Sequence, residues 1–345
     1  MTLVLGLEST CDDTCASVVI DGVKVLSNVV STQQEMHEKF RGVVPEMASR
    51  AHLERMLPVL QQALDRAGVS ANDLDAVAVS NRPGLIGGVM VSVTTAKVLS
   101  WALNIPLVGI NHIHAHLYTG FMEEPQCNMP AVALTASGGH TLLCLVRSSL
   151  EYEVLGSTID DAGGEAFDKG ANLLGLKGGG GKALDELALG GDPKAVKFPR
   201  PMLAEEGYRF SFAGLKTALL YYLHGPGNKP QDPYAEPDIA PDVLKDIAAS
   251  YQEAICEVLV KKAFRACDEF GASSLFVTGG VAANSRLRTM TVEMAAKKRI
   301  KPVFPAMALC TDNAAMIAGL GYEFLSRDIH DELDLAAHAR SEETG

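Results

Sequence analysis

The chain has 345 residues, 47% of them hydrophobic, and a formal net charge of −12, which suits one large or two ordinary domains and argues against a broad nucleic-acid-binding face. Its seven cysteines form no Cys-x-x-Cys pair, so we expect no disulfide framework. No apolar run reaches about 18 residues and the first strand starts at Leu3, so we expect a cytoplasmic protein with no membrane-spanning helix and no leader peptide.

The first elements predicted along the chain form a hairpin. Residues 3–8 and 16–20 are apolar and extended, and the polar turn Ser9–Thr14 separates them. Residues 131–135 and 141–146 repeat this pattern around a second polar turn, Ser137–His140. Two such units far apart in the chain predict two related lobes, each opening with a phosphate-facing turn, rather than a solenoid.

Helices and strands are predicted to alternate through the rest of the chain. Helices are expected at 51–67, 89–103, 165–174, 248–270, 284–298 and 312–325, and strands at 73–79 and 274–278. The first of these helices places Leu53, Met56, Leu57, Leu60 and Leu64 on one apolar face. Three segments are expected outside regular structure: a glycine loop at 177–182, an exposed proline-rich insertion at 224–241 and a disordered acidic tail at 331–345.

The segment Asn111–His116 carries the most informative motif. Asn111 is a good helix N-cap, so His112 and His116 lie four apart on one face of a helix, within reach of a single metal ion. A zinc-protease motif would place Glu directly after the first histidine, where this chain has Ile113. The pair therefore predicts a metal that holds or polarises a substrate without a built-in proteolytic base.

A metal would need at least one more protein ligand. Asp312, at a predicted helix N-terminus, and His140 are both candidates, and spacing does not choose between them. The alternative is a buried histidine pair that is hydrogen-bonded to the backbone.

Three glycine-containing turns, at 137–140, 178–181 and 279–284, lie at the ends of predicted strands or helices. Backbone N–H groups at such turns can cradle phosphate oxygens, and their joint presence favours a phosphate ligand over glycines that merely permit positive φ. Single carboxylates are weaker signals. Asp12 and Asp13 suit a solvated turn, and Asp168 and Asp185 suit ordinary helix positions.

The motifs, taken together and in order, resemble the tRNA N6-adenosine threonylcarbamoyltransferases (the TsaD family) of bacterial type. The resemblance is carried by Glu8–Thr14, Gly42–Arg50, Pro83–Leu85, His112 with His116, Ser137–Thr141, Asp160–Lys169, Phe210–Thr217, Gly279–Asn284 and Cys310–Asn313. These motifs run from the start of the chain to about Leu325.

The resemblance implies an α/β fold of the actin/hexokinase-like (ASKHA) type, with two lobes of mixed sheets flanked by helices and a ligand cleft between them. It implies an N-terminal lobe at 1–128, on which a C-terminal helix at 312–327 packs back, and a C-terminal lobe at 129–311. This agrees with the duplicated hairpins.

The resemblance also implies the site residues. His112, His116 and Asp312 would bind one divalent metal, Fe(II) before Zn(II), and the former also suits two histidines and one carboxylate on chemical grounds. The residues implied to bind substrate are Thr135, Ala136, Ser137, Gly138, Gly139, Asp168, Gly181, Asp185 and Asn284. Asp13 is a candidate proton acceptor, although the family usually has Glu at this position.

The implied reaction is transfer of the threonylcarbamoyl group from threonylcarbamoyl-AMP to N6 of adenosine-37 in tRNAs that read codons beginning with A, with release of AMP. The implied partners are tRNA, a metal-less paralogue (TsaB-like) and a small ATPase (TsaE-like). The rival functions are a metallopeptidase, against which Ile113 counts, and a non-catalytic ASKHA-fold scaffold. Against the scaffold counts the presence of all three implied metal ligands, His112, His116 and Asp312. A sugar or acetate kinase of the same fold would not need the histidine pair.

Overall fold

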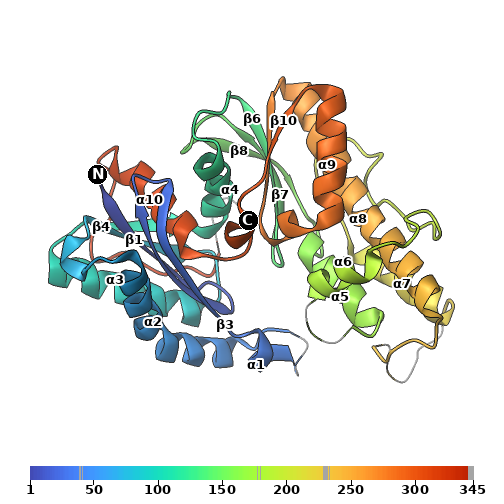
Figure 1. Cartoon of the computed structure of the whole chain (residues 1–345), viewed down its shortest axis with the longest axis horizontal. Coiled ribbons are helices and arrows are strands. Elements are labelled where there is room, and N and C mark those ends of the chain that lie inside the picture. The colour runs from blue at the N-terminus through green and yellow to red at the C-terminus, as the bar shows by residue number, and fades with distance from the viewer. Residues whose placement is uncertain are drawn as a thin grey trace. The chain divides into compact units, whose positions relative to one another are not determined.

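The computed structural model describes residues 1–38, 40, 42–176, 178, 180–227, 232 and 234–340 (Figure 1). The chain divides into two compact units. Unit 1 comprises Met1–Gln126 and Pro305–Gly345, and unit 2 comprises Cys127–Phe304. The last part of the chain therefore returns to the unit that the first part builds.

Unit 1 is built on a mixed five-stranded sheet with the order β3-β2-β1-β4-β5. Its strands are β1 (Leu3–Glu8), β2 (Asp13–Ile20), β3 (Lys24–Thr32), β4 (Ala76–Arg82) and β5 (Leu107–Asn111). Strand β1 pairs antiparallel with β2, in a register that joins Leu3 to Ile20, and parallel with β4. The predicted hairpin is therefore the centre of this sheet.

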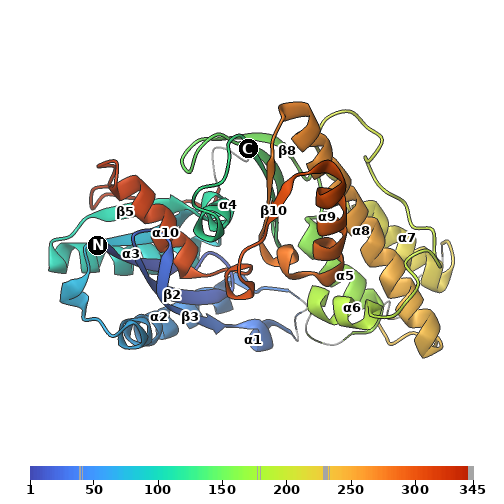
Figure 2. The same cartoon turned by 45° about the horizontal axis from the view of Figure 1, so that its top comes forward.

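Helices cover both faces of the unit 1 sheet (Figure 2). They are α1 (Gln34–Glu38), α2 (Pro45–Ala67), α3 (Ile86–Leu103), α4 (His112–Glu123) and α10 (Ala314–Leu325), with short 3-10 turns at Ala71–Asp73 and Met307–Leu309. Leu5 and Leu7 pack into a core with residues of α2 such as Met56. Gly6 points to the opposite face, where a Cβ would lie 2.1 Å from Ala314 O, so α10 sits directly on the strand.

Unit 2 repeats this topology with the order β10-β9-β6-β7-β8. Its strands are β6 (Ala131–Ala136), β7 (Thr141–Val146), β8 (Tyr152–Ser157), β9 (Ser274–Thr278) and β10 (Lys301–Val303). Its helices are α5 (Gly163–Leu173), α6 (Gly180–Ala188), α7 (Ala213–His224), α8 (Pro241–Phe270) and α9 (Ser285–Lys298), with a 3-10 turn at Gly280–Ala283. Strand β6 pairs antiparallel with β7 and parallel with β9, as β1 does with β2 and β4. The predicted duplication is present.

Several elements differ from the sequence predictions. Helix α2 starts at Pro45, earlier than expected, because proline is well suited to the first helical turn. Its predicted apolar face is wrong at two positions: Leu53 and Leu57 are 72% and 67% exposed. Helix α6 starts at Gly180, so part of the expected glycine loop at 177–182 is helical, while Lys177 and Gly179 lie outside the described residues.

The insertion at 224–241 lies between α7, which ends at His224, and α8, which starts at Pro241. Residues 228–231 and 233 lie outside the described residues.

The tail, which was expected to be disordered from residue 331, is ordered in the structure as far as residue 340. Asp331 bridges Leu107 at the edge of β5, the His338 N–H donates to Asn81 O at 2.8 Å, and Leu335 packs on Gly109. Composition suggested disorder, but an edge strand offers free backbone groups and Leu335 adds apolar contact. Residues 341–345 lie outside the described part.

One described helix, α3, is long and apolar enough to cross a membrane by length and composition alone. In the fold it packs against α2 and β4 and buries its small and branched residues, including Val89, Val93 and Ala96. Its opposite face exposes Met90, Val98 and Trp101. The apolar residues of α3 therefore pack into the core on one face of the helix and are exposed to solvent on the other.

Candidate metal centre and nucleotide-binding turn

The start of helix α4 places two histidines on one buried face. Strand β5 ends at Asn111, whose side-chain oxygen accepts the Ile113 N–H at 2.9 Å and caps the helix. His112 and His116 follow one turn apart, and their ring centroids lie 4.7 Å from each other. Both are nearly inaccessible to solvent, so each needs a polar partner inside unit 1.

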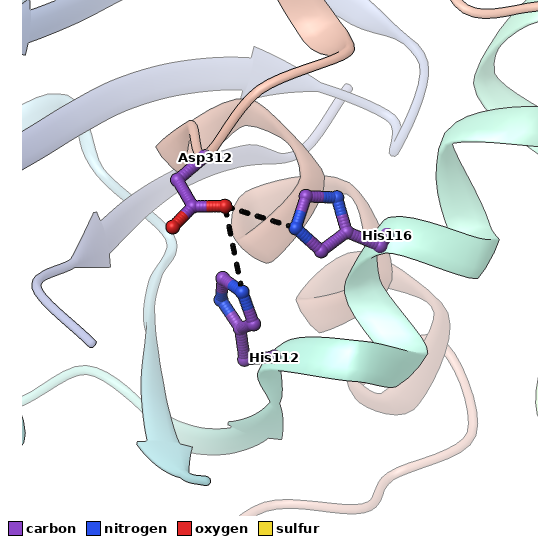
Figure 3. A group of neighbouring side chains, drawn as sticks. All are labelled: His112, His116 and Asp312. Atoms are coloured by element: carbon purple, nitrogen blue, oxygen red, sulfur yellow. Dashed lines mark hydrogen bonds and ion pairs between the residues drawn. The ribbon is translucent and has the colours of Figure 1, made fainter. Parts of the chain in front are cut away.

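Asp312 supplies that partner from the segment before α10. Its Oδ1 lies 3.0 Å from His116 Nε2 and 3.6 Å from His112 Nε2 (Figure 3). The three possible ligand atoms lie within 4.8 Å of one another. Asn313 caps α10 by accepting the Met316 N–H at 3.0 Å, and this cap fixes the segment that carries Asp312. The other candidate for third ligand, His140, belongs to unit 2.

Glu8 fixes the orientation of His112 from behind. Its Oε2 lies 2.9 Å from His112 Nδ1, and its Oε1 accepts the Thr10 N–H at 2.5 Å. Since the carboxylate accepts, the Nδ1 of His112 donates, and Nε2 is the ring atom that faces Asp312. A histidine oriented by a carboxylate in this way is typical of metal ligands. Two imidazoles and one carboxylate suit Fe(II) or Zn(II).

The charges around this cluster favour a cation. Burial lowers the pKa of His112, but the negative charges of Glu8 and Asp312 outweigh this effect and raise it to about 9. Burial, together with the charges of Asp312 and Asp12, raises the pKa of Asp13 to about 7. Among the described residues, no side chain or backbone group hydrogen-bonds to Asp13 Oδ1, which is buried. Carboxylates gathered at one place repel one another, and a bound cation would relieve that repulsion.

The equivalent turn of unit 2 is open instead of charged. The Ser137 N–H donates to His140 O at 2.8 Å, which closes the turn after β6. No described atom lies within 4 Å of the place where a Cβ would stand at Gly138 or Gly139. The Gly164 N–H donates to Ser137 O at 3.1 Å and brings the start of α5 against the turn. Thr135 and Ala136, which precede it, are buried in β6. Exposed backbone beside a helix N-terminus suits a phosphate.

The other predicted substrate residues cap helices of unit 2. Asp168 Oδ1 accepts the Gly181 N–H at 2.7 Å at the start of α6. Asp185 accepts from the backbone and hydroxyl of Ser285 at 2.9 and 2.7 Å at the start of α9. Asn284 caps the same helix by accepting the Leu287 N–H at 2.9 Å, and it donates to Gln252 at 2.8 Å. These caps tie α5 to α6 and α6 to α9.

Sequence reasoning did not assign roles to Glu8 or Thr10, which lie directly behind His112. The available signal was the position of Glu8, a charged residue at the end of an otherwise apolar strand. A carboxylate there costs free energy unless it is paired, so its presence indicated a buried partner.

Comparison with known proteins identifies the family. The family model described as "tRNA N6-adenosine threonylcarbamoyltransferase" (TsaD) matches residues 24–319. A protein of that name from Clostridioides difficile is 46% identical over 95% of this chain and 95% of its own length. Another, from Trichlorobacter lovleyi, is 48% identical over 98% of this chain and 96% of its own length.

Solved structures support the fold at low sequence identity. The dehydratase component A of Acidaminococcus fermentans matches with a TM-score of 0.55 and 13% identity over 94% of this chain and all of its own. HypF of T. kodakarensis matches with a TM-score of 0.59 and 16% identity over 97% of this chain and 49% of its own. The expected ASKHA-type fold is confirmed. The chain belongs to the tRNA N6-adenosine threonylcarbamoyltransferase family.

Proposed function

We propose that this chain transfers the threonylcarbamoyl group from threonylcarbamoyl-AMP to N6 of adenosine-37 in tRNAs that read codons beginning with A. The N6 nitrogen forms a bond to the carbamoyl carbon, the bond from that carbon to the phosphate oxygen breaks, and AMP leaves with the electron pair. The observation that carries this proposal is family membership over nearly the whole chain, together with an intact histidine–carboxylate cluster in unit 1.

The exocyclic amine of adenosine is a weak nucleophile because its lone pair is delocalised into the ring. Placement and stabilisation of the developing charge must therefore supply most of the rate. When bound at His112, His116 and Asp312, an Fe(II) or Zn(II) ion would supply Lewis acidity toward the threonylcarbamoyl group. Asp13 accepts the proton that N6 loses, a role that its raised pKa of about 7 and its unpaired oxygen support.

Unit 2 holds the AMP part of the donor in this proposal. The N–H groups of Gly138 and Gly139 bind the phosphate, and the open space above the two glycines supports this role. Ser137 shapes the turn, because its own N–H donates to His140 O. The strand end at Thr135 and Ala136 shapes the same turn. The caps formed by Asp168, Asp185 and Asn284, together with Gly181, fix the helix ends that would line the adenosine.

Exposed apolar residues on unit 1 support the proposal of a protein partner. Leu53 and Leu57 of α2, and Met90, Val98 and Trp101 of α3, are all exposed on two helices that pack together. Such a surface on a chain with net charge −12 suits a protein partner better than tRNA. We assign it to the metal-less, TsaB-like paralogue, with a small TsaE-like ATPase completing the assembly in the cytoplasm. tRNA would then dock on the assembly.

The rival functions are less well supported. The matching relatives are named as transferases, and Ile113 occupies the position where a zinc protease has its glutamate. A scaffold without catalysis would not need Glu8 behind His112 or the carboxylates of the first turn.

The direct test is a transfer assay. The purified chain with its partner subunits, tRNA and threonylcarbamoyl-AMP should yield threonylcarbamoyladenosine, measured by mass spectrometry of digested tRNA. Asp13→Glu should retain activity, since it restores the residue that is usual in the family, whereas Asp13→Asn should lose about 10²-fold or more, the size of a general-base contribution. Product-free tRNA with wild-type protein would contradict the function. Full activity of Asp13→Asn would remove only the role of Asp13.

A further inference from the structure

The buried ring of His52 joins helix α2 to the turn between β1 and β2. Its Nε2 lies 3.0 Å from Cys11 O, and its Nδ1 lies 2.8 Å from Thr14 Oγ1. A carbonyl oxygen can only accept, so Nε2 carries the proton and Nδ1 accepts from the Thr14 hydroxyl. Burial lowers the pKa of His52, which agrees with a neutral ring. The His52 side chain therefore links Cys11, within the turn, to Thr14, at the start of β2.

Helix α3 holds the first half of the same turn. Ser9 Oγ donates to Gly88 O at 2.9 Å, and the Leu85 N–H donates to Thr10 O at 2.7 Å. A Cβ at Gly88 would lie 2.4 Å from Ser9 O and 3.0 Å from His52 Cδ2. The backbone of α3 therefore touches both the turn and the ring, and little room is left for the turn to move.

The turn connects these bonds to the metal centre. The Thr10 N–H donates to one oxygen of Glu8, and the other oxygen faces His112 Nδ1. The Thr10 N–H belongs to the Ser9–Thr10 peptide, and His52 holds the next part of the same short turn through Cys11 O. The described residues that could together hold a metal are His112, His116 and Asp312. His52 is not one of them, so we expect it to change the metal affinity indirectly, through the turn.

We propose that His52 is a positioning residue of the metal centre: its ring holds the Ser9–Thr14 turn in the conformation that lets Glu8 orient His112 as a ligand, and thereby sets the metal affinity. This inference rests on the proposed metal site. It assigns to α2 a task beyond packing, because the face of α2 that carries His52 lies against the turn.

The test measures Zn(II) affinity of the metal-free full chain by competition with a chromophoric chelator. His52→Leu should bind Zn(II) about 10-fold more weakly. This is the low end of the loss of metal affinity that follows removal of a residue that orients a metal ligand. His52→Gln can keep a donor near Cys11 O and should recover part of that loss. Val59→Ala is the control: it removes buried contacts from the same helix without touching the turn, so it should lower the melting temperature and leave the Zn(II) affinity unchanged.

A double-mutant cycle with Glu8→Gln tests the route. If His52 acts through Glu8, the double variant should bind Zn(II) no more weakly than Glu8→Gln alone, whereas independent effects would multiply. Multiplying effects, or wild-type affinity of His52→Leu beside a weakened Glu8→Gln, would overturn the inference and leave the metal site standing.

The metal site itself is tested separately from His52. If His112→Ala and Glu8→Gln both bind Zn(II) like wild type, the proposed site is wrong and the inference fails with it.

If His52→Leu does not fold, Thr14→Val replaces it in the same Zn(II) measurement, because it removes only the hydroxyl that bonds to His52 Nδ1. It should weaken Zn(II) binding less than His52→Leu, and an unchanged affinity would count against the inference.

Discussion

The two hairpin turns of this protein stand at equivalent places in two sheets of the same topology, yet their chemistry is opposite. The turn of unit 1 contains Asp12, with Glu8 and Asp13 at the adjoining strand ends. Hydrogen bonds connect this turn to α2 and to α3. The turn of unit 2 carries Gly138 and Gly139, beside which the described structure leaves open space. Carboxylates attract a cation, whereas free backbone N–H groups attract an anion.

In the proposed function, the two turns of this duplicated fold divide the ligands between them, with a metal at the first turn and the AMP phosphate at the second. The strand order fixes where each turn lies, and the residues of each turn decide what it binds. The restraint of each turn also differs in kind. The first is held by side chains such as His52, and the second is held by its own backbone and by Gly164. Substitutions in one turn should therefore leave the ligand of the other turn in place.

The largest expected effect is loss of the metal. His112→Ala, His116→Ala and Asp312→Ala should each lose bound metal and transferase activity while remaining folded, because an incomplete ligand set cannot hold the ion. AMP affinity should stay at the wild-type value, since AMP is assigned to unit 2. Metal content by elemental analysis and AMP binding by calorimetry check this. Full metal occupancy in all three variants would contradict the assignment.

The next effect concerns the open turn. A Gly138→Ala, Gly139→Ala double variant should fold normally, because the described structure leaves room for both methyl groups. It should bind AMP about 10-fold or more weakly, a cost of about 1.4 kcal/mol, since the methyl groups stand where the phosphate approaches. Metal content should not change. Wild-type AMP affinity would show that the phosphate lies elsewhere.

A smaller effect is the pH dependence of metal binding. With a pKa of about 9, His112 is protonated in the metal-free protein at neutral pH, and a metal must displace that proton. Zn(II) affinity should therefore rise by about tenfold per pH unit below 9 and level off above it. Glu8→Gln removes a negative charge that raises this pKa, so its plateau should begin at a lower pH. An affinity that does not vary with pH would contradict the arrangement.

The smallest effect is on stability. The pKa of Asp13 is about 7 in the folded chain and ordinarily near 3.8. A carboxyl group with a raised folded pKa loses stabilisation as the pH rises from its unfolded value through its folded value. Metal-free Asp13→Asn should therefore melt about 6 °C above wild type at pH 8, and the difference should vanish near pH 4. A constant difference across that range would show that Asp13 is not perturbed.

Much of this arrangement was predictable from sequence. Strands β1 and β2 are apolar segments separated by a polar turn, and Asn111 is a recognisable N-cap at the start of α4. Local sequence patterns therefore sufficed to predict both features. Local patterns failed for Leu53 and Leu57, because an exposed apolar residue looks the same in the sequence as one that faces a core.

Other features depend on contacts distant in the chain. The segment after Asp331 reads as a solvated tail, but its order comes from Leu107 and Asn81, more than two hundred residues earlier. The position of Asp312 beside the two histidines, and that of His52 against the first turn, likewise depend on the way β1, α2, α4 and α10 meet. Spacing along the sequence cannot report such contacts.

The central claim is that unit 1 binds the metal at the ligands described. The most direct measurement is anomalous diffraction from a crystal of the chain grown with Fe(II) or Zn(II), with data collected on both sides of the absorption edge of that metal. The account predicts one strong anomalous peak about 2.0–2.2 Å from the Nε2 atoms of His112 and His116 and from a carboxylate oxygen of Asp312. A metal peak at other residues, or no peak at this cluster in a metal-loaded and active sample, would contradict it.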